Sequence, residues 1–386
     1  MVWMMGILTI IALLLFLNIL AGINRIGELE KFPAENHTEL ISVVIAAKDE
    51  EDSISSTIDS LLKQKQVDLE IIPVNDRSSD RTDEIIDTIA RNHASVKPIH
   101  IKELPEGWLG KNHALSVGAE KATGTYIVFA DADVNFSEDM LSKALACIKN
   151  ECADHLTVAP AFTASSTLLK GFISIFLFGF TVLKRPWRAN KNKRTGGIGI
   201  GAFQMIMKSC YQETGGYSRL RMRPDDDLAF GQHVKRLGYR QRIVTGLSDL
   251  KVEWYPDLKT AVRGLEKNVF AGFNYSILAA AATIIAVFVT HILPFILLII
   301  GRPTIQIISL TLCFLLLCMY SLTTVKFTNF PIFIVLLLPL SASLILFTIV
   351  RSLWLTWKHK GIYWRGTHYS LKEMKQHFKQ NQEGHR

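Results

Sequence analysis

Long apolar stretches lie near both ends of the chain, and alternating strand and helix patterns lie between them. The stretch Val2–Ile23 is almost uncharged, long enough to cross a bilayer as a helix, and not followed by the small residues of a signal-peptide cleavage site. Three further apolar blocks cover 277–300, 305–322 and 332–350. By length the first and third can span a membrane, whereas the second is marginal. We therefore expect a retained membrane anchor in residues 1–25 and membrane helices within 277–355.

The middle of the chain repeats a strand pattern followed by a helix pattern. Its apolar runs are continuous, as in strands that are buried on both faces. Polar segments then lead into amphipathic helix patterns, the first of which covers 54–62. Strand and helix alternation of this kind predicts an α/β fold with one mostly parallel, Rossmann-like sheet domain over residues 40–275. The expected strands are 41–47, 69–74, 96–101, 125–128 and 203–207.

A shorter apolar stretch, 171–183, interrupts the middle of the chain. At about 13 residues it is too short to span a bilayer. Because Lys170 and Lys184 flank it, we expect a helix that lies in the membrane interface, with a buried core helix as the alternative.

The charge and the cysteine content indicate which partners and which compartment the protein has. The formal net charge is +8, but no basic motif interleaved with aromatic residues occurs, so we expect no nucleic-acid partner. The basic residues instead follow apolar segments, which predicts contact with anionic lipids and a cytoplasmic orientation. The five cysteines have no zinc-finger spacing and suit free thiols in a reducing compartment. The basic clusters are Lys184, Arg185, Arg188, Lys191, Lys193 and Arg194, and, in a basic tail over 356–386, Lys358, Lys360, Arg365, Lys372, Lys375 and Lys379.

The basic tail also constrains the number of membrane crossings. If the central domain is cytoplasmic, three spans after it would place the tail outside, against the positive-inside tendency. His291 and Pro294 interrupt the first C-terminal block, and the second block is short. We therefore expect an even number of crossings, with one block re-entrant or interfacial, in a multi-pass protein of the cell membrane.

Two carboxylates, Asp131 and Asp133, follow the strand expected at 125–128. The carboxyl ends of parallel strands form the edge at which open α/β sheets bind ligands. Two carboxylates there suit Mg²⁺ or Mn²⁺ shared with substrate phosphates. A solvated turn is the alternative, since the spacing alone is common. Neither a G-x-G-x-x-G motif after the first strand nor a P-loop motif occurs.

Six motifs, taken together in order and spacing, resemble the inverting glycosyltransferases of family 2. The resemblance covers nearly all of 40–275 and implies a nucleotide-diphospho-sugar-binding domain and a hexosyltransferase-type activity. The anchor, the third motif and the segment "YWRGTHYSL" resemble more narrowly the bacterial membrane glycosyltransferases of carotenoid and hopanoid pathways. The six motifs are "VVIAAKDEE", "VNDRSSDRT", "GWLGKNHAL", "FADADV", "GAFQMIMKSCYQETGGY" and "PDDDLAFGQHVKRLGYR".

The resemblance implies roles for individual side chains. Asp49 and Asp76 would contact the base and ribose of a nucleotide sugar, although helix capping is an alternative for both. Lys111 would approach the diphosphate, unless it is a solvated lysine at a helix start. Asp131 would face the ribose or the sugar, and Asp133 would hold the metal ion that stabilises the leaving diphosphate.

The catalytic base is expected among three adjacent acids, Asp225, Asp226 and Asp227. The family pattern is an acidic pair, two further residues, and then a large apolar residue and a glycine. Counting back from Phe230-Gly231 places the pair at Asp226 and Asp227, with Asp226 where glutamate is usual. Asp227 is then the expected base, and repulsion among the three carboxylates raises the pKa of at least one. Asp225 is expected only to balance a helix dipole.

Two further segments bear on the substrate. In the glycine-rich segment 195–202, a phosphate cradle is possible, but the resemblance places Gly197 near the donor sugar and acceptor. The Q-x-x-R-W motif of processive members is absent from the region around 254–268, which favours transfer of a single sugar. Lys267 and Asn268 are candidates for contact with the diphosphate or with lipid headgroups.

These observations predict a metal-dependent membrane glycosyltransferase. It would move one sugar from a nucleotide-diphosphate sugar, a UDP-sugar in the first place, to a lipidic acceptor such as a carotenoid, hopanoid, glycerolipid or polyprenyl phosphate. One alternative is an exopolysaccharide-type glycosyltransferase. Another is a non-catalytic, nucleotide-sugar-binding partner of another membrane synthase.

Overall fold

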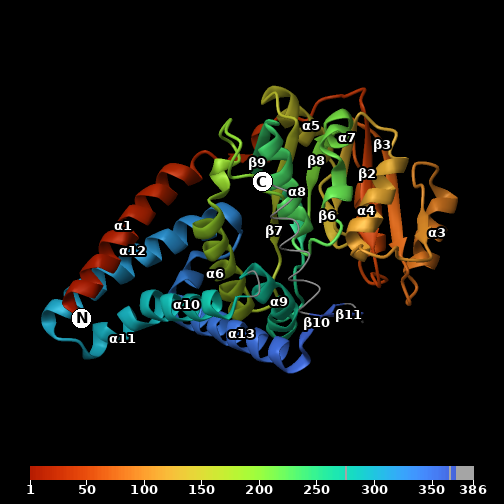
Figure 1. Cartoon of the computed structure of the whole chain (residues 1–386). Coiled ribbons are helices and arrows are strands. Elements are labelled where there is room, and N and C mark those ends of the chain that lie inside the picture. Colours follow the sequence, from red (N-terminus) through yellow and green to blue (C-terminus); the bar gives the residue numbers. More distant parts are fainter. Residues whose placement is uncertain (274–275, 365–366, 371–386) are drawn as a thin grey trace. The chain divides into compact units, whose positions relative to one another are not determined.

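The chain folds into two units, shown in Figure 1 as a computed structural model that describes residues 1–273, 276–364 and 367–370. One unit, which we call the sheet unit, consists of Asn24–Thr163 and Lys184–Glu253. The other, the helical unit, consists of Met1–Ile23, Ala164–Leu183 and the described residues from Trp254 onward. All five cysteines lie in the described part of the chain and are free thiols.

The sheet unit is built on a mixed, mostly parallel sheet, which confirms the expected fold class. Strand β2 (Leu40–Ala47) carries the continuous apolar run of the sequence and is buried almost throughout, as expected for a central parallel strand. Within the described residues the strands lie in the order β1 (Gly27–Glu28), β9 (Gln241–Val252), β7 (His155–Phe162), β8 (Gln204–Met207), β5 (Tyr126–Ala130), β2 (Leu40–Ala47), β3 (Asp68–Asp76) and β4 (Ile99–Ile101), with β6 (Val134–Phe136) beside β9.

Strand β8 runs against its neighbours, which positions the site. It pairs antiparallel with both β5 and β7, whereas β2 is parallel to β3 and β5, and β7 is parallel to β9. The start of β8 therefore lies at the sheet edge where the parallel strands end. The strand expected at 96–101 is reduced to Ile99–Ile101, with a single further bridge at Val96.

Helices pack on the sheet through apolar side chains at helical spacing. On one face, Ala114 and Leu115 of α4 (Gly110–Lys121) and Phe230 and Val234 of α8 (Asp226–Leu237) join a buried cluster with strand residues such as Phe129. Phe129 and Phe230 contact edge to face, with ring centroids 5.8 Å apart. The helices of the sheet unit are α2 (Ile54–Leu62), α3 (Thr82–Asn92), α4 (Gly110–Lys121), α5 (Met140–Asn150), α7 (Lys208–Thr214) and α8 (Asp226–Leu237).

The helical unit is assembled from separate parts of the chain. Helix α1 (Val2–Ile23) packs against α12 (Pro303–Phe327), and α9 (Leu258–Gly272) packs against α13 (Leu338–His359). Helix α6 joins the same unit, since Tyr320 Oη of α12 donates a hydrogen bond to Gly171 O of α6 at 2.9 Å. The elements are α1 (Val2–Ile23), α6 (Thr167–Lys184), α9 (Leu258–Gly272), α10 (Ile277–Val287), α11 (Leu293–Ile300), α12 (Pro303–Phe327), α13 (Leu338–His359) and the hairpin β10 (Gly361–Trp364) and β11 (Thr367–Ser370).

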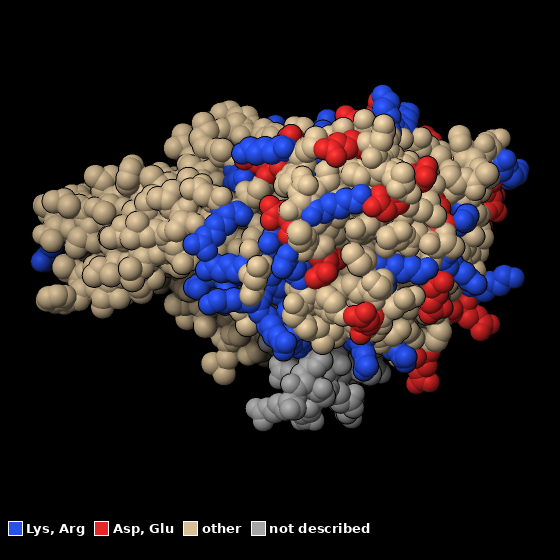
Figure 2. Space-filling model, turned by 90° about the horizontal axis from the view of Figure 1, so that it is seen from above, with Lys and Arg blue, Asp and Glu red and all other residues tan. Residues whose placement is uncertain are grey.

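Five helices of the described chain are long and apolar enough to cross a membrane, as expected for a membrane protein. They are Val2–Ile23, Thr167–Lys184, Ile277–Ile300, Pro303–Phe327 and Ile332–His359. Several expose large apolar side chains, such as Leu14, Ile299 and Phe314. Figure 2 shows part of the surface covered by Lys, Arg, Asp and Glu side chains and another part with almost none.

Two of these lengths correct the expectations from sequence. Helix α6 has 18 residues because it begins at Thr167, before the uniformly apolar stretch, so length alone does not prevent it from spanning. Helix α12 has 25 residues because polar residues at both ends continue the helix, and it is not marginal. Around His291, a π-helical turn over Phe288–Ile292 joins α10 to α11 without ending the helical path.

Candidate active site

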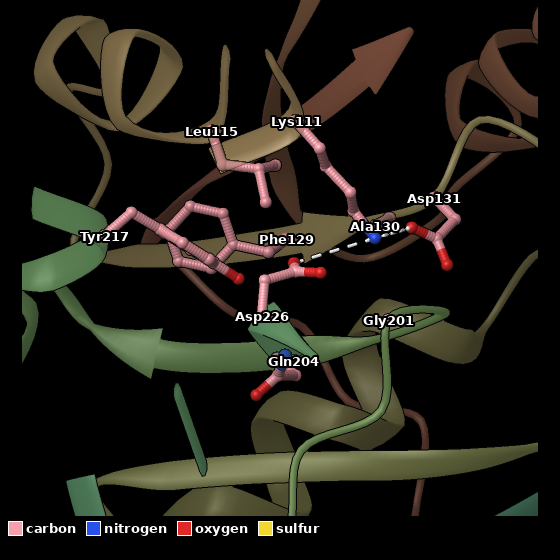
Figure 3. A pocket seen from close by; sticks show the side chains of 9 residues that line it. All are labelled: Lys111, Leu115, Phe129, Ala130, Asp131, Gly201, Gln204, Tyr217 and Asp226. Carbon is pink, nitrogen blue, oxygen red and sulfur yellow. Dashed lines mark ion pairs between the residues drawn. The ribbon is translucent and has the colours of Figure 1, made fainter. Parts of the chain in front are cut away.

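A pocket opens at the sheet edge where β5 ends, where β8 begins, and where helices α4 and α8 start (Figure 3). Its acidic and basic groups come from three of these elements. Asp131 directly follows β5, Lys111 is the second residue of α4, and Asp226 is the first residue of α8. The pocket is lined by Lys111, Leu115, Phe129, Ala130, Asp131, Gly201, Gln204, Tyr217 and Asp226.

Lys111 lies between two carboxylates of this pocket. Its Nζ is 2.7 Å from Asp131 Oδ1 and 3.6 Å from Asp226 Oδ2. Burial by itself lowers the pKa of Lys111, but the charges of Asp131, Asp226 and Asp227 outweigh it and hold the pKa above the usual range. Lys111 is therefore a fixed positive charge in the pocket.

Asp226 is the most deeply buried acid of the pocket. Burial, together with the charges of Asp227, Asp131 and Asp225, raises its pKa to about 7, although Lys111 opposes the rise. Its Oδ2 atom has no hydrogen-bond partner among the described residues and lies 3.6 Å from Nζ of Lys111. The ionisation of Asp226 therefore depends on Lys111.

Asp227 lies beside Asp226 but is held by backbone amides. Its Oδ2 accepts a hydrogen bond from Gly201 N at 2.8 Å, and its Oδ1 accepts one from Leu228 N at 2.7 Å. Burial raises the pKa of Asp227, and Lys111 and the two amides act in the opposite direction. A Cβ on Gly199 would lie 1.9 Å from Asp227 O, so only glycine allows this loop to approach α8 so closely. The two amides fix the orientation of the Asp227 carboxylate.

Asp133 supplies a further carboxylate near the pocket. Burial, followed by the negative charges of Asp131 and Glu50, raises its pKa to about 7. A group with this charge environment favours a cation beside it, and oxygen ligands are those that Mg²⁺ and Mn²⁺ prefer. No cluster of three or more His, Cys, Asp or Glu ligands occurs within the described residues. The residues present therefore fit a cation that takes only one or two ligands from the protein and the rest from substrate.

Asp49 and Asp76 do not line this pocket. Asp49 Oδ1 accepts hydrogen bonds from the backbone N and the Oγ of Ser79, at 2.7 and 3.0 Å. Asp76 accepts from Arg77 Nε at 2.8 Å and from Arg77 Nη2 at 3.1 Å. A Cβ on Gly110 would lie 2.0 Å from Asp76 Oδ2, so Asp76 packs against the residue before Lys111. Their roles toward a nucleotide stay predictions.

The glycine-rich segment meets the pocket through a different residue from the one expected. Gly201 lines the pocket, whereas a Cβ on Gly197 would lie 2.5 Å from Gly231 O, so Gly197 packs against α8. Reasoning from sequence also missed Gln204 and Tyr217, although both lie in the quoted motif "GAFQMIMKSCYQETGGY". The side chains of Lys267 and Asn268, part of "YWRGTHYSL" and the tail after 370 lie outside the described residues.

Comparisons with known proteins find a matching family model and curated relatives. Residues 42–215 match the family model "Glycosyl transferase family 2". A curated relative, 4,4'-diaponeurosporenoate glycosyltransferase of Staphylococcus aureus strain MRSA252, is 23% identical over 296 residues, which cover 73% of this chain and 78% of the relative.

Similar solved structures are more distant. S. aureus TarS has 16% identity and a TM-score of 0.39, and the match covers 60% of this chain and 39% of that one. Mannosyltransferase PcManGT of Pyrobaculum calidifontis, solved with GDP-Man and Mn²⁺, has 18% identity and a TM-score of 0.48 over 83% of this chain and 98% of that one. On the family match and the curated relative, residues 42–215 form a glycosyl transferase family 2 domain, and the chain that contains them is a glycosyltransferase.

Proposed function

We propose that this enzyme transfers one sugar, with inversion, from a nucleotide-diphosphate sugar to a lipidic acceptor at a membrane. The observation that carries the proposal is the pocket in which Lys111, Asp131 and Asp226 meet beside the oriented carboxylate of Asp227. The name of the curated relative, which specifies 4,4'-diaponeurosporenoate, supports a carotenoid acid as the first acceptor to test. The apolar helices support an acceptor that is taken from a bilayer.

Asp227 is the proposed general base. The hydroxyl or carboxylate oxygen of the acceptor attacks the anomeric carbon, the bond from that carbon to the diphosphate oxygen breaks, and any proton on the attacking oxygen passes to Asp227. Hydrogen bonds from Gly201 N and Leu228 N favour the ionised carboxylate and fix its direction. Asp226, which faces Lys111, is proposed to set the charge of the pocket.

A divalent cation is proposed at Asp133. Mg²⁺ or Mn²⁺ bound there would supply positive charge to the leaving diphosphate. Burial and the charges of Asp131 and Glu50 raise the pKa of Asp133. A cation beside Asp133 would stabilise its ionised carboxylate, which supports the proposed site. Lys111 contributes the other positive charge of the pocket.

The limits of the catalytic domain and its orientation in the membrane are also part of the proposal. We propose that residues 40–275 carry the catalytic domain on the cytoplasmic side of the cell membrane, the side that the basic residues beside the apolar segments favour. The five candidate helices support a multi-pass protein, and the positive-inside tendency supports an even number of crossings.

The test is a transfer assay with purified full-length protein. We would incubate it with a panel of UDP- and GDP-sugars, Mn²⁺ and membrane lipid extract, with 4,4'-diaponeurosporenoate added in a parallel reaction, and analyse the lipids by mass spectrometry. The expected product is a lipid that has gained one sugar residue and is not extended further. Absence of any glycosylated lipid with every donor would overturn the proposal, and long sugar chains would favour the polysaccharide alternative.

A further inference from the structure

The side chain of Gln204 has a buried amide nitrogen that no described group satisfies. Gln204 is the first residue of β8, is 1% exposed and lines the pocket with Lys111, Asp131 and Asp226. Its Nε2 has no hydrogen-bond partner within the described part of the chain. Figure 3 shows the nitrogen end of this side chain toward Asp226 and the oxygen end pointing away. A buried N–H donor without a partner costs free energy unless a ligand completes it.

A chain of hydrogen bonds fixes which end of the Gln204 amide faces the pocket. The chain starts at two backbone groups whose roles are certain: Ile198 N donates to Gln241 Oε1 at 2.9 Å, and Gly231 O accepts from Gln241 Nε2 at 3.1 Å. Gln241 Nε2 therefore also faces His155 Nδ1 as a donor, at 2.9 Å. His155 Nδ1 must then be the acceptor, which puts the ring proton on Nε2.

The same chain continues from His155 to the pocket. His155 Nε2 lies 3.2 Å from Gln204 Oε1 and donates to it, because the ring proton is on Nε2. If the Gln204 amide were turned around, its NH₂ group would face the N–H of His155, and two donors would meet. The Nε2 atom of Gln204 therefore lies on the pocket side. Burial lowers the pKa of His155 to about 4, so the ring stays neutral and keeps this tautomer near neutral pH. The orientation of Gln204 is therefore built into β7, β8 and β9.

The neighbours of Gln204 indicate what chemistry its free N–H would take. The pocket presents the carboxylates of Asp131 and Asp226, which repel phosphate, and the single cation Lys111 is already paired with both. A sugar hydroxyl suits such a place, because it can donate its hydrogen to a carboxylate and accept one from an amide.

We propose that Gln204 is a sugar-binding residue whose Nε2 donates a hydrogen bond to a hydroxyl oxygen of the transferred sugar, and that His155 and Gln241 are its positioning residues. This inference rests on the proposed transfer from a nucleotide-diphosphate sugar. It predicts that Gln204 recognises the sugar and not the nucleotide.

The experiment compares binding of the sugar with binding of the nucleotide alone. Full-length wild type and Gln204→Met would be titrated by calorimetry with the donor that the wild type uses, with its nucleoside diphosphate, and with its monodeoxy sugar versions. Gln204→Met keeps the size of the side chain and removes the donor. We expect about tenfold weaker binding of the sugar nucleotide, unchanged binding of the nucleoside diphosphate, and loss of wild-type discrimination against one deoxy sugar.

Two further variants keep the result interpretable. Gln204→Glu retains an acceptor for His155 Nε2–H but lacks the outward N–H, so it should lose the same discrimination even if Gln204→Met folds poorly. Gln212→Met, at an exposed glutamine outside this pocket, is the matched control and should behave as the wild type.

The outcomes separate this inference from the proposed function. Equal weakening for the sugar nucleotide and the nucleoside diphosphate, or unchanged discrimination among deoxy sugars, would overturn the role of Gln204. If discrimination among deoxy sugars is unchanged and only the pH profile of activity shifts, Gln204 serves to hold Asp226, and its proposed contact with the sugar is overturned. If the wild type binds nucleotide sugars but glycosylates no lipid, the proposed transfer fails while the binding comparison still decides the role of Gln204.

Discussion

Replacing Lys111 by methionine is the sharpest test of how the pocket is held together. The substitution keeps the apolar stem and removes the only ammonium group that lies between Asp131 and Asp226 in the described structure. Lys111 lowers the pKa values of Asp226 and Asp133, whereas burial and the charge of Asp131 raise both, so the substitution removes a positive charge that offsets these effects. We expect a loss of stability that grows with pH, and a loss of activity.

The size of the loss follows from the distances. At an effective dielectric constant of about 20, unit charges separated by 2.7 Å and 3.6 Å attract by roughly 6 and 5 kcal/mol. The Asp131 side chain is 36% exposed, so solvent screens the first pair, and the desolvation of Lys111 offsets much of both. A net destabilisation of about 2–3 kcal/mol at pH 8 remains, or roughly 5–10 °C in Tm for a unit of this size.

The sign of the pH dependence follows from proton linkage. The pKa values of Asp226 and Asp133 are raised to about 7 in the folded state from an ordinary 3.8, so the folded protein binds more protons than the unfolded chain between these values. The free energy of unfolding therefore falls as pH rises from about 4 to about 7 and levels off above that. Without Lys111 the folded pKa values rise further, so the deficit of the variant is small at pH 5 and largest at pH 8.

The assay is thermal unfolding of the detergent-solubilised protein at pH 5 and pH 8. Lys121→Met, at an exposed lysine in the last turn of the same helix, is the control and should change Tm little at either pH. A Lys111→Met deficit that is equal at the two pH values, or no larger than that of Lys121→Met, would refute the electrostatic account of the pocket.

Four further predictions concern the base, the metal, the glycine-rich loop and the topology. Asp227→Asn should leave binding of the nucleotide sugar nearly intact and reduce turnover by roughly two to four orders of magnitude, measured by calorimetry and the transfer assay; normal turnover by this variant, with Asp226→Asn inactive, would move the base by one residue. Asp133→Ala should abolish transfer and weaken binding of the nucleoside diphosphate, and a chelator should do the same to the wild type; full activity in excess chelator would rule out the cation. Gly231→Ala would place a Cβ 2.2 Å from Ile198 O, so it should lower the stability by about 1–3 kcal/mol in thermal unfolding, and an unchanged Tm would contradict the packing. A reporter fused after Arg386 should be active only in the cytoplasm, and activity only outside the cell would contradict an even number of crossings.

The sequence was most informative where local pattern and burial coincide. The apolar run 41–47 differs from β2 by one residue, because a strand buried on both faces must be apolar throughout. The sequence placed Lys111 and the acids 225–227 at helix starts, and α4 begins at Gly110 and α8 at Asp226. The acids after the strands could be assigned to a ligand edge because parallel strands end on one side.

The features that the sequence did not predict depend mostly on contacts between residues that are distant in the chain. That β8 lies reversed between β5 and β7 is decided by strand contacts across the chain, which periodicity does not contain. Asp76 pairs with its neighbour Arg77. The backbone at Arg77 has a φ of 56°, and a pattern of residue types does not predict this conformation. Which glycine of 195–202 faces the pocket depends on the register of one loop against α8, and Gln204 is oriented through His155 and Gln241, distant in the chain.

The pairing of α1 with α12 has a consequence for the order in which the protein is made. About 280 residues separate Ile23 from Pro303, so α12 leaves the ribosome roughly 15–60 s after α1 at about 5–20 residues per second. During that interval α1 has no partner, and its uniformly apolar surface lets it reside in lipid alone. The sheet unit is synthesised completely in the same interval. The contact between α1 and α12 therefore forms only after the sheet unit has been made.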